Sequence, residues 1–234
     1  MKVAIFLLGI LIGMSSSSFA QKVQTAGAMR SVMMGTDLSD HLRWDTLAKA
    51  GLYGLSPLHL LGGEVTVIDG KIFVSTVSPT CAITVKETNE PVSAPFGVFT
   101  HVTSWYEKKV KAAVSSEENL QKWIEKQAIA VGKSLENPFV FTIKADFDLV
   151  GYHIISKDST IQEHNHELHD LAKKQYSVEN TSGELIGFYS RNHEGVFTHK
   201  GSFIHIHFID TAKRQMGHLE EIKWKGKGVL KIGK

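Results

Sequence analysis

Short runs of β-branched and aromatic residues, separated by turn residues, make up most of the hydrophobic pattern of this chain. The clearest pair of runs covers residues 64–68 and 71–75, with Asp69-Gly70 between them. An Asp-Gly dipeptide between two such runs is typical of the two-residue turn of a β-hairpin. The pattern therefore predicts a hairpin over residues 64–75.

The same β-rich pattern recurs along the chain. It predicts strands over residues 96–105, 139–144, 147–155, 184–190, 203–209 and 219–224. The lysine- and glycine-rich end, residues 225–234, lacks the pattern, and we expect it to fray. Because the strands follow one another too closely for regular βαβ units, the expected fold class is α+β, dominated by β-structure with one or two helices.

Apolar residues recur at helical spacing most clearly within residues 120–131. This helix is expected to begin at Ser115 or Ser116, and Glu118 follows Ser115 by three residues as in a capping box. Shorter helices are expected around residues 29–34 and within residues 157–174.

The composition is that of an ordinary globular protein. The chain has 234 residues, of which 42% are hydrophobic and 21% charged, and this excludes a disordered, collagen-like or coiled-coil protein. Lysine and arginine number 26 against 24 acidic residues. No surplus of positive charge is available to neutralise a phosphate backbone, so we expect no nucleic-acid partner.

Residues 1–20 have the features of a signal peptide: one lysine, an apolar run of about a dozen residues, and the small residues Ser18 and Ala20 before the cleavage point. The run is shorter than the roughly 20 residues that span a bilayer. We therefore expect an exported protein, periplasmic or secreted, that leaves the membrane after cleavage. The single cysteine, Cys81, excludes an intrachain disulfide, and we expect it to be buried as a small hydrophobic residue.

Histidine is the residue type that points to chemistry. The chain has 12 histidines, which concentrate in the C-terminal half. Alternation along the strand at 203–209 places His205 and His207 on one face, about 7 Å apart, where both reach one metal ion. His218 follows a turn and returns beside them. Three imidazoles with an open fourth position are typical of catalytic zinc sites. The alternative is that these histidines face water or pack in the core without a metal.

Two further residues are candidates for the same pocket. His199 precedes the histidine strand closely enough to line the pocket. Glu64 begins an otherwise apolar strand, so it is either a placed acid or a solvated strand end. We interpret His164, His166 and His169 as part of a solvated polar segment.

At these residues the sequence resembles the acetolactate decarboxylase family, zinc enzymes that convert 2-acetolactate to acetoin. The resemblance extends from about residue 45 to residue 222. It is carried by the segment Gly62-Gly63-Glu64 ahead of Asp69-Gly70, by Gly187-Phe188, and by the spacing of His205, His207 and Gly217-His218.

The resemblance implies roles for particular residues. His205, His207 and His218 match the zinc ligands, and Glu64 matches the active-site glutamate. The resemblance also implies that residues 21–234 form one acetolactate decarboxylase-like domain. Its two β-rich halves, approximately 21–135 and 136–234, would close on the metal site, and the protein would commonly be a homodimer.

Two departures from the family pattern affect the site. His153 stands where the family has an arginine that holds the substrate carboxylate, and an imidazole binds an anion in this way only when protonated. The C-terminal residues 225–234 contain no counterpart of the family's tail glutamate. Glu220 and Glu221 are too near His218 to be taken as equivalents. We therefore assign His153 or His199, in protonated form, to hold the departing carboxylate.

The expected function is zinc-dependent decarboxylation of 2-acetolactate, or of a similar 2-hydroxy-3-keto acid, to acetoin. The substrate hydroxyl and ketone oxygens would chelate Zn²⁺, which would stabilise the enediolate left by loss of carbon dioxide. Glu64, with its pKa raised by burial, would protonate that enediolate. The alternative is an exported metal-binding or ligand-binding homologue that has lost catalysis, as the two departures suggest.

Overall fold

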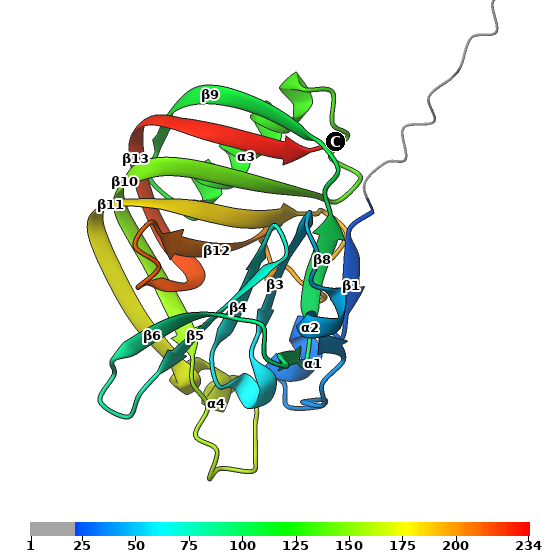
Figure 1. The fold of residues 1–234 in the computed structure, drawn as a ribbon, viewed down its shortest axis with the longest axis vertical. Helices are drawn as coiled ribbons and strands as arrows, with labels where there is room; N and C mark the ends of the chain where they lie inside the picture. Colours follow the sequence, from blue (N-terminus) through cyan, green and yellow to red (C-terminus); the bar gives the residue numbers. More distant parts are fainter. Residues whose placement is uncertain (1–21) are drawn as a thin grey trace, which may run out of the picture.

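The computed structural model describes residues 22–234, which form two large antiparallel β-sheets that face each other and a small two-stranded sheet of residues 42–43 and 93–94 (Figure 1). The predicted signal peptide lies outside the described residues. Within the described part of the chain, no helix is both long and apolar enough to cross a membrane. The β-dominated α+β class predicted from the sequence is confirmed.

The elements of the described chain follow one another in this order. They are β1 (Gln24–Ala26), α1 (Met29–Met33), β2 (Leu42–Arg43), α2 (Trp44–Leu47), β3 (Leu52–Pro57), the 3₁₀ turn η1 (His59–Leu61), β4 (Glu64–Ile68), β5 (Lys71–Val77), β6 (Ile83–Thr88), β7 (Ser93–Ala94), β8 (Gly97–His101), β9 (Trp105–Val114), α3 (Glu117–Ala130), β10 (Phe139–Ile155), α4 (His166–Ala172), β11 (Lys173–Tyr189), β12 (Ile204–Asp210) and β13 (Met216–Gly233).

The first sheet has six strands in the order β1-β8-β3-β4-β5-β6. Its central hairpin, β4–β5, is the one predicted from the sequence, with Val65 opposite Val74. The turn residues Asp69 and Gly70 have φ angles of 51° and 81°. These left-handed values are what a two-residue turn requires, and Asp and Gly adopt them more readily than most residues.

The second sheet has five strands in the order β10-β11-β12-β13-β9, and β10 also pairs with β13. Strands β10 to β13 therefore form a closed circuit. The two strands expected at 139–144 and 147–155 are one continuous strand, β10, whose pairing with β13 is irregular between Ala145 and Leu149. Strand β12 pairs with β11 on one side. On its other side it pairs with the first three residues of β13, which places His207 directly opposite His218.

An apolar core joins the two sheets. Leu55, Phe73 and Val98 from the first sheet pack with residues of the second, including Ile186 and Phe188. The opposite face of the second sheet is covered by α3, whose contacts fall on β9 and β13. The predicted helix is thus confirmed, and of the two expected starts, the N-cap is Ser116. Its hydroxyl accepts a hydrogen bond from the Asn119 N–H at 3.1 Å.

The prediction that residues 225–234 fray is wrong. This segment continues β13 to Gly233 and pairs with β9 on one side and β10 on the other. Leu230 and Ile232 are each 1% exposed, whereas Lys225, Lys227 and Lys231, at the alternate positions of the strand, are exposed or partly exposed. Alternating lysines hide the strand pattern, since a strand with one buried face needs apolar residues only at every second position.

The tail therefore contributes to stability. Replacing Ile232 by alanine is expected to lower the free energy of unfolding by about 2–5 kcal/mol, because it leaves a cavity in the core. Denaturant unfolding measures this loss. Lys227→Ala is the matched control on the exposed face of the same strand, where a change within about 0.5 kcal/mol is expected. An equally small loss for both variants contradicts the structural role of the tail.

The expectation that Cys81 is buried is also wrong. Cys81 is exposed and lies in the turn between β5 and β6, with φ at 61°. The turn is closed by backbone hydrogen bonds from Cys81 to Ser78 and from Ser78 to Ala82. Turn geometry brings the residue to the surface and overrides the general preference of cysteine for burial.

Candidate metal and active site

Three buried histidines converge where β12 meets β13. His205 and His207 lie on the face of β12 that is turned toward the first sheet, away from Ile204, Ile206 and Phe208, and His218 comes from β13. One nitrogen from each ring lies within 4.8 Å of the others. Within residues 22–234, this is the only group of three or more His, Cys, Asp or Glu side chains found in metal-binding range. The alternation along the strand and the returning neighbour thus produce the predicted convergence.

The nitrogens of this triad fit a metal ion. Nδ1 of His207 lies 2.9 Å from Oγ1 of Thr66, to which it donates when it carries the proton, and this leaves the lone pair on Nε2. That Nε2 atom and Nδ1 of His205 are buried without a hydrogen-bond partner. An unpaired buried polar atom costs about 1–3 kcal/mol, a cost that a bound ion removes.

The protonation state of the triad also suits a metal. Burial is the main cause that lowers the pKa of all three imidazoles, to about 3 for His205 and well below the usual value for His207 and His218. Neighbouring rings of the cluster lower these pKa values further. The rings are therefore neutral near pH 7, and neutral imidazole is the form that binds a metal. Three neutral nitrogens suit Zn²⁺ and related divalent ions.

Glu64, at the start of β4, faces this triad from the other sheet. Its side chain is 5% exposed, so it is a placed acid and not a solvated strand end. Its Oε1 accepts a hydrogen bond from the Ile155 N–H at 3.1 Å, and its Oε2 lies 3.7 Å from Nε2 of His207. Burial raises the pKa of Glu64 well above its ordinary value, more than the Ile155 hydrogen bond lowers it. Burial therefore favours the protonated, neutral form of this carboxyl group.

His153 and His199 stand beside the triad, with ring centroids 4.8 Å and 5.2 Å from that of His218. Nδ1 of His153 donates to Oε1 of Glu220 at 2.6 Å, and its Nε2 lies 3.8 Å from Oε1 of Glu64. Burial lowers the pKa of both histidines, to about 4 for His199. Both predicted residues are thus brought to the site, but neither carries the positive charge that the sequence-based assignment requires.

Three other residues reach the site without having been predicted. Glu220 is skipped where the pairing of β10 with β13 shifts register, and its partly exposed side chain accepts a hydrogen bond from His153. His169 in α4 is buried, contrary to the solvated segment expected there, and burial lowers its pKa to about 3. Lys173 begins β11. The signal that points to Glu220 is its position two residues after His218.

These side chains enclose a small cavity. Its volume is about 30 Å³, and it is closed on the apolar side by Met29 and Phe96. Glu64, His205 and His218 line it together with Lys173. A cavity of this size holds an ion or one or two waters. The wall therefore has acidic, imidazole and lysine groups within reach of a single occupant.

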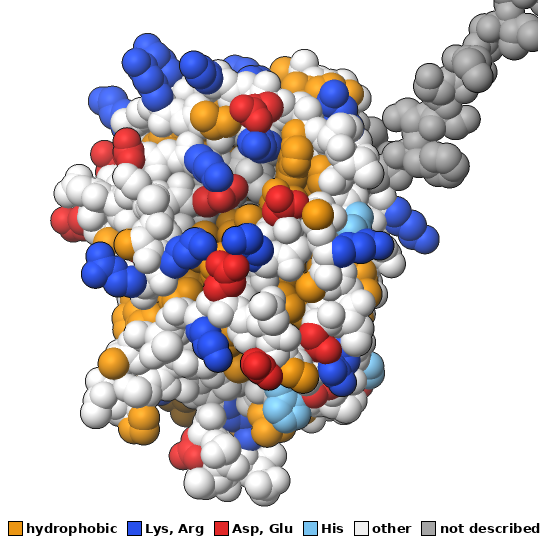
Figure 2. Space-filling view, in the orientation of Figure 1, with side chains coloured by type: hydrophobic (Ala, Val, Ile, Leu, Met, Phe, Trp, Pro, Cys, Tyr) orange, Lys and Arg blue, Asp and Glu red, His pale blue; other side chains and the backbone are white. Residues whose placement is uncertain are grey.

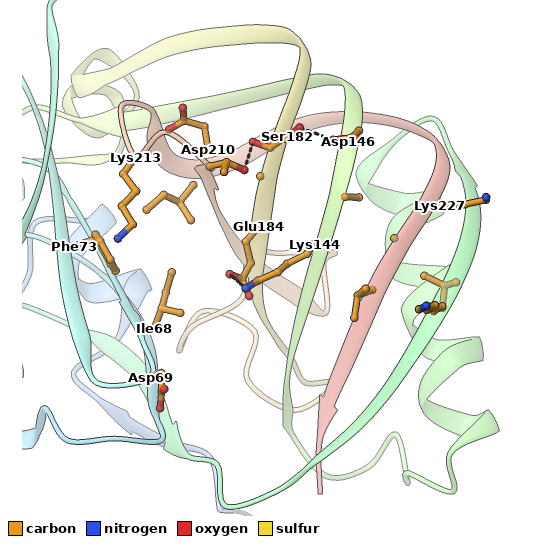
Figure 3. Close-up of a pocket in the computed structure, with 18 of the residues that line it drawn as sticks. Ile68, Asp69, Phe73, Lys144, Asp146, Ser182, Glu184, Asp210, Lys213 and Lys227 are labelled. Carbon is orange, nitrogen blue, oxygen red and sulfur yellow. Dashed lines mark hydrogen bonds and ion pairs between the residues drawn. The ribbon is translucent and has the colours of Figure 1, made fainter.

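A much larger groove, of about 1100 Å³, lies elsewhere between the sheets (Figure 3). It runs from Ile68 and Phe73 to Lys144 and Glu184, and those last two form an ion pair at 3.3 Å. Figure 2 shows apolar side chains exposed among lysines and acidic residues on the face seen there. None of the groove's lining residues lines the histidine cavity, and the groove holds no histidine. Size alone therefore does not identify the candidate site.

Comparisons with known proteins agree with this geometry. An alpha-acetolactate decarboxylase from Brevibacillus brevis is 27% identical over 204 residues, which cover 84% of this chain and 64% of that protein. This chain thus spans slightly less than two thirds of the length of that curated relative.

Solved structures share the fold. The alpha-acetolactate decarboxylase from Bacillus subtilis strain 168 superposes with a TM-score of 0.72 at 18% identity, covering 91% of this chain and 85% of that one. A Staphylococcus aureus protein of unknown function, described as similar to alpha-acetolactate decarboxylase, gives a TM-score of 0.70 at 16% identity and covers 90% and 84%. The family model for alpha-acetolactate decarboxylase matches residues 23–234, nearly the whole described chain. The chain therefore belongs to the alpha-acetolactate decarboxylase family.

Proposed function

We propose that this protein decarboxylates 2-acetolactate, or a similar 2-hydroxy-3-keto acid, to acetoin with the help of a bound Zn²⁺ ion. The observation that carries the proposal is the convergence of three buried imidazoles beside the buried carboxyl group of Glu64, whose burial favours its protonated form. Membership of the family supports decarboxylation as the reaction type. The exported location and the homodimer expected from the sequence stay part of the proposal.

The metal would be held by His205, His207 and His218. When Nδ1 of His207 carries the proton, Thr66 accepts a hydrogen bond from it and so orients the ring, as outer-shell partners of metal ligands commonly do. When bound, a divalent ion supplies the positive charge that stabilises negative charge developing on substrate oxygens as carbon dioxide leaves.

Glu64 supplies the proton. Loss of carbon dioxide leaves an enediolate, and protonation of its carbon yields acetoin. Oε1 of Glu64 is held by the Ile155 N–H, while Oε2 points toward the triad. After transfer, the same N–H stabilises the carboxylate, which regains a proton from water. The net reaction consumes one proton and one acetolactate anion and releases carbon dioxide and acetoin.

Neutral His199 can act as a hydrogen-bond donor on the cavity wall, whereas the single N–H of neutral His153 already donates to Glu220 and leaves its Nε2 as an acceptor. Glu220 accepts a hydrogen bond from the Nδ1–H of His153 and so fixes the orientation of that ring. The cavity is smaller than a whole keto acid, so wall side chains must move aside on binding. They then exclude water from the enediolate, which limits its protonation to Glu64.

The test is an assay of the zinc-loaded protein with 2-acetolactate. Carbon dioxide and acetoin are expected to appear together, a chelator should stop their release, and added Zn²⁺ should restore it. Zinc-loaded protein that releases no carbon dioxide contradicts the proposal. That result would favour the exported metal-binding or ligand-binding homologue.

A further inference from the structure

We propose that Lys173 binds the carboxylate of the substrate and thereby selects acids over neutral molecules of the same shape. This inference rests on the proposed decarboxylation, since it assigns the binding group for that substrate. It concerns a residue for which the sequence pattern predicts no role.

Lys173 stands at the wall of the histidine cavity. It is the first residue of β11 and pairs with Ile155 of β10, whose N–H holds Glu64. Its side chain is 18% exposed, and it is the only lysine or arginine among the described residues that line the cavity. The lysine is thus held against the cavity by the same strand pair that positions the proposed proton donor.

A carboxylate that enters this cavity needs a positive partner. It loses water, and burying a carboxylate without such a partner is very unfavourable. The proposed metal ion would take the hydroxyl and ketone oxygens of the substrate, the histidines on the wall have no permanent charge, and Glu64 is itself an acid. Lys173 supplies a compact ammonium group with three donors.

The ammonium group of Lys173 can donate more hydrogen bonds than its ion pair with Asp170 uses. Among the described residues, its ion-pair partner is Oδ1 of Asp170, 3.0 Å away, and the Asp170 side chain is 49% exposed. This bond uses one of the three N–H groups and anchors the lysine at the end of α4. The positive charge also extends into the cluster, since after burial it is the next cause that lowers the pKa of His199 and of His169.

The chemistry of decarboxylation determines which kinetic constant Lys173 affects. The carboxylate loses its charge as it becomes carbon dioxide, so its attraction to the lysine is weaker in the transition state than in the ground state. An interaction of that kind raises substrate affinity and does not raise kcat. Removal of the lysine is therefore expected to raise KM about 10-fold to 100-fold and to leave kcat unchanged or slightly higher.

The decisive measurement is binding without turnover. The probe is 2-hydroxyisobutyrate, an unreactive 2-hydroxy acid, compared with its neutral amide by calorimetry on the zinc-loaded full chain. Wild type is expected to bind the acid more tightly than the amide. Lys173→Met should weaken acid binding about 10-fold to 100-fold and leave amide binding unchanged, whereas Lys173→Arg should keep the preference for the acid.

Lys174→Met is the matched control. Lys174 is the next residue of β11, pairs with Ile154, and does not line the cavity. The Lys174→Met protein should bind both the acid and the amide as tightly as wild type does. Zinc content is measured for each variant first, and if Lys173→Met loses zinc, Lys173→Gln takes its place in the comparison.

The outcomes separate this inference from the proposed function. A Lys173 variant that keeps its zinc and binds the acid as tightly as wild type overturns the inference, whatever the turnover. A wild type whose preference for the acid depends on Lys173, but which releases no carbon dioxide from acetolactate, upholds the inference and refutes the decarboxylase. Equal losses in the Lys173 and Lys174 variants also overturn the inference, since they point to a general charge effect.

Discussion

Purified His207→Ala protein is expected to contain no bound zinc and to show no decarboxylation. The substitution removes one of three nitrogens that converge within 4.8 Å, and the remaining two offer an incomplete site. Loss of an outer-shell partner alone reduces metal affinity by about 10-fold to 100-fold, so loss of a ligand should exceed this. Elemental analysis after dialysis measures the zinc content, and the acetoin assay measures activity.

Two control variants make this result specific. His166→Ala changes a histidine of α4 that does not line the cavity, and it should leave the zinc content unchanged. Thr66→Val removes only the partner of His207 Nδ1, and it should weaken zinc affinity by about 10-fold to 100-fold. Wild-type zinc content in His207→Ala would refute the ligand assignment.

Glu64→Gln is expected to lower kcat by about 100-fold to 10,000-fold while zinc content stays at the wild-type level. Glutamine has nearly the same shape, and its carbonyl oxygen still accepts the Ile155 N–H, but it has no acidic proton to give to the enediolate. Steady-state kinetics and elemental analysis on the same preparation measure the two quantities.

The matched control is Glu118→Gln, which changes an exposed carboxylate on α3 that pairs with Lys122. It should keep wild-type kinetics. A Glu64→Gln enzyme with undiminished kcat excludes Glu64 as the proton donor. A Glu64→Gln enzyme without zinc shows instead that this carboxyl group helps to hold the metal.

Burial shifts the pKa values of the proposed metal ligands and of Glu64 in opposite directions. Burial acts in opposite directions on the two kinds of group, because in each case it disfavours the charged form. It favours the unprotonated form of the three imidazoles, with the pKa of His205 lowered to about 3, and it favours the protonated form of Glu64. A single physical cause therefore prepares the metal ligands and the proposed acid together.

The sequence alone determined the local part of this site. Period-two alternation in residues 203–209 specifies that His205 and His207 share a face, and a short return brings His218 opposite His207. The hairpin at Asp69-Gly70 and the helix capped by Ser116 are local in the same sense. Each depends on residues only a few positions apart, so their patterns are visible in the chain.

Only the tertiary structure decided what faces the histidines. Glu64 arrives from the other sheet, Glu220 meets His153 of β10 from a partly exposed position, and Lys173 is brought in at the start of β11. The ordered tail depends likewise on β9 and β10 on either side of it. Periodicity reports which side chains share a face, but which faces meet is determined by pairing and packing between distant segments. The charge and shape of the cavity are therefore properties of the closed pair of sheets and of no single stretch of sequence.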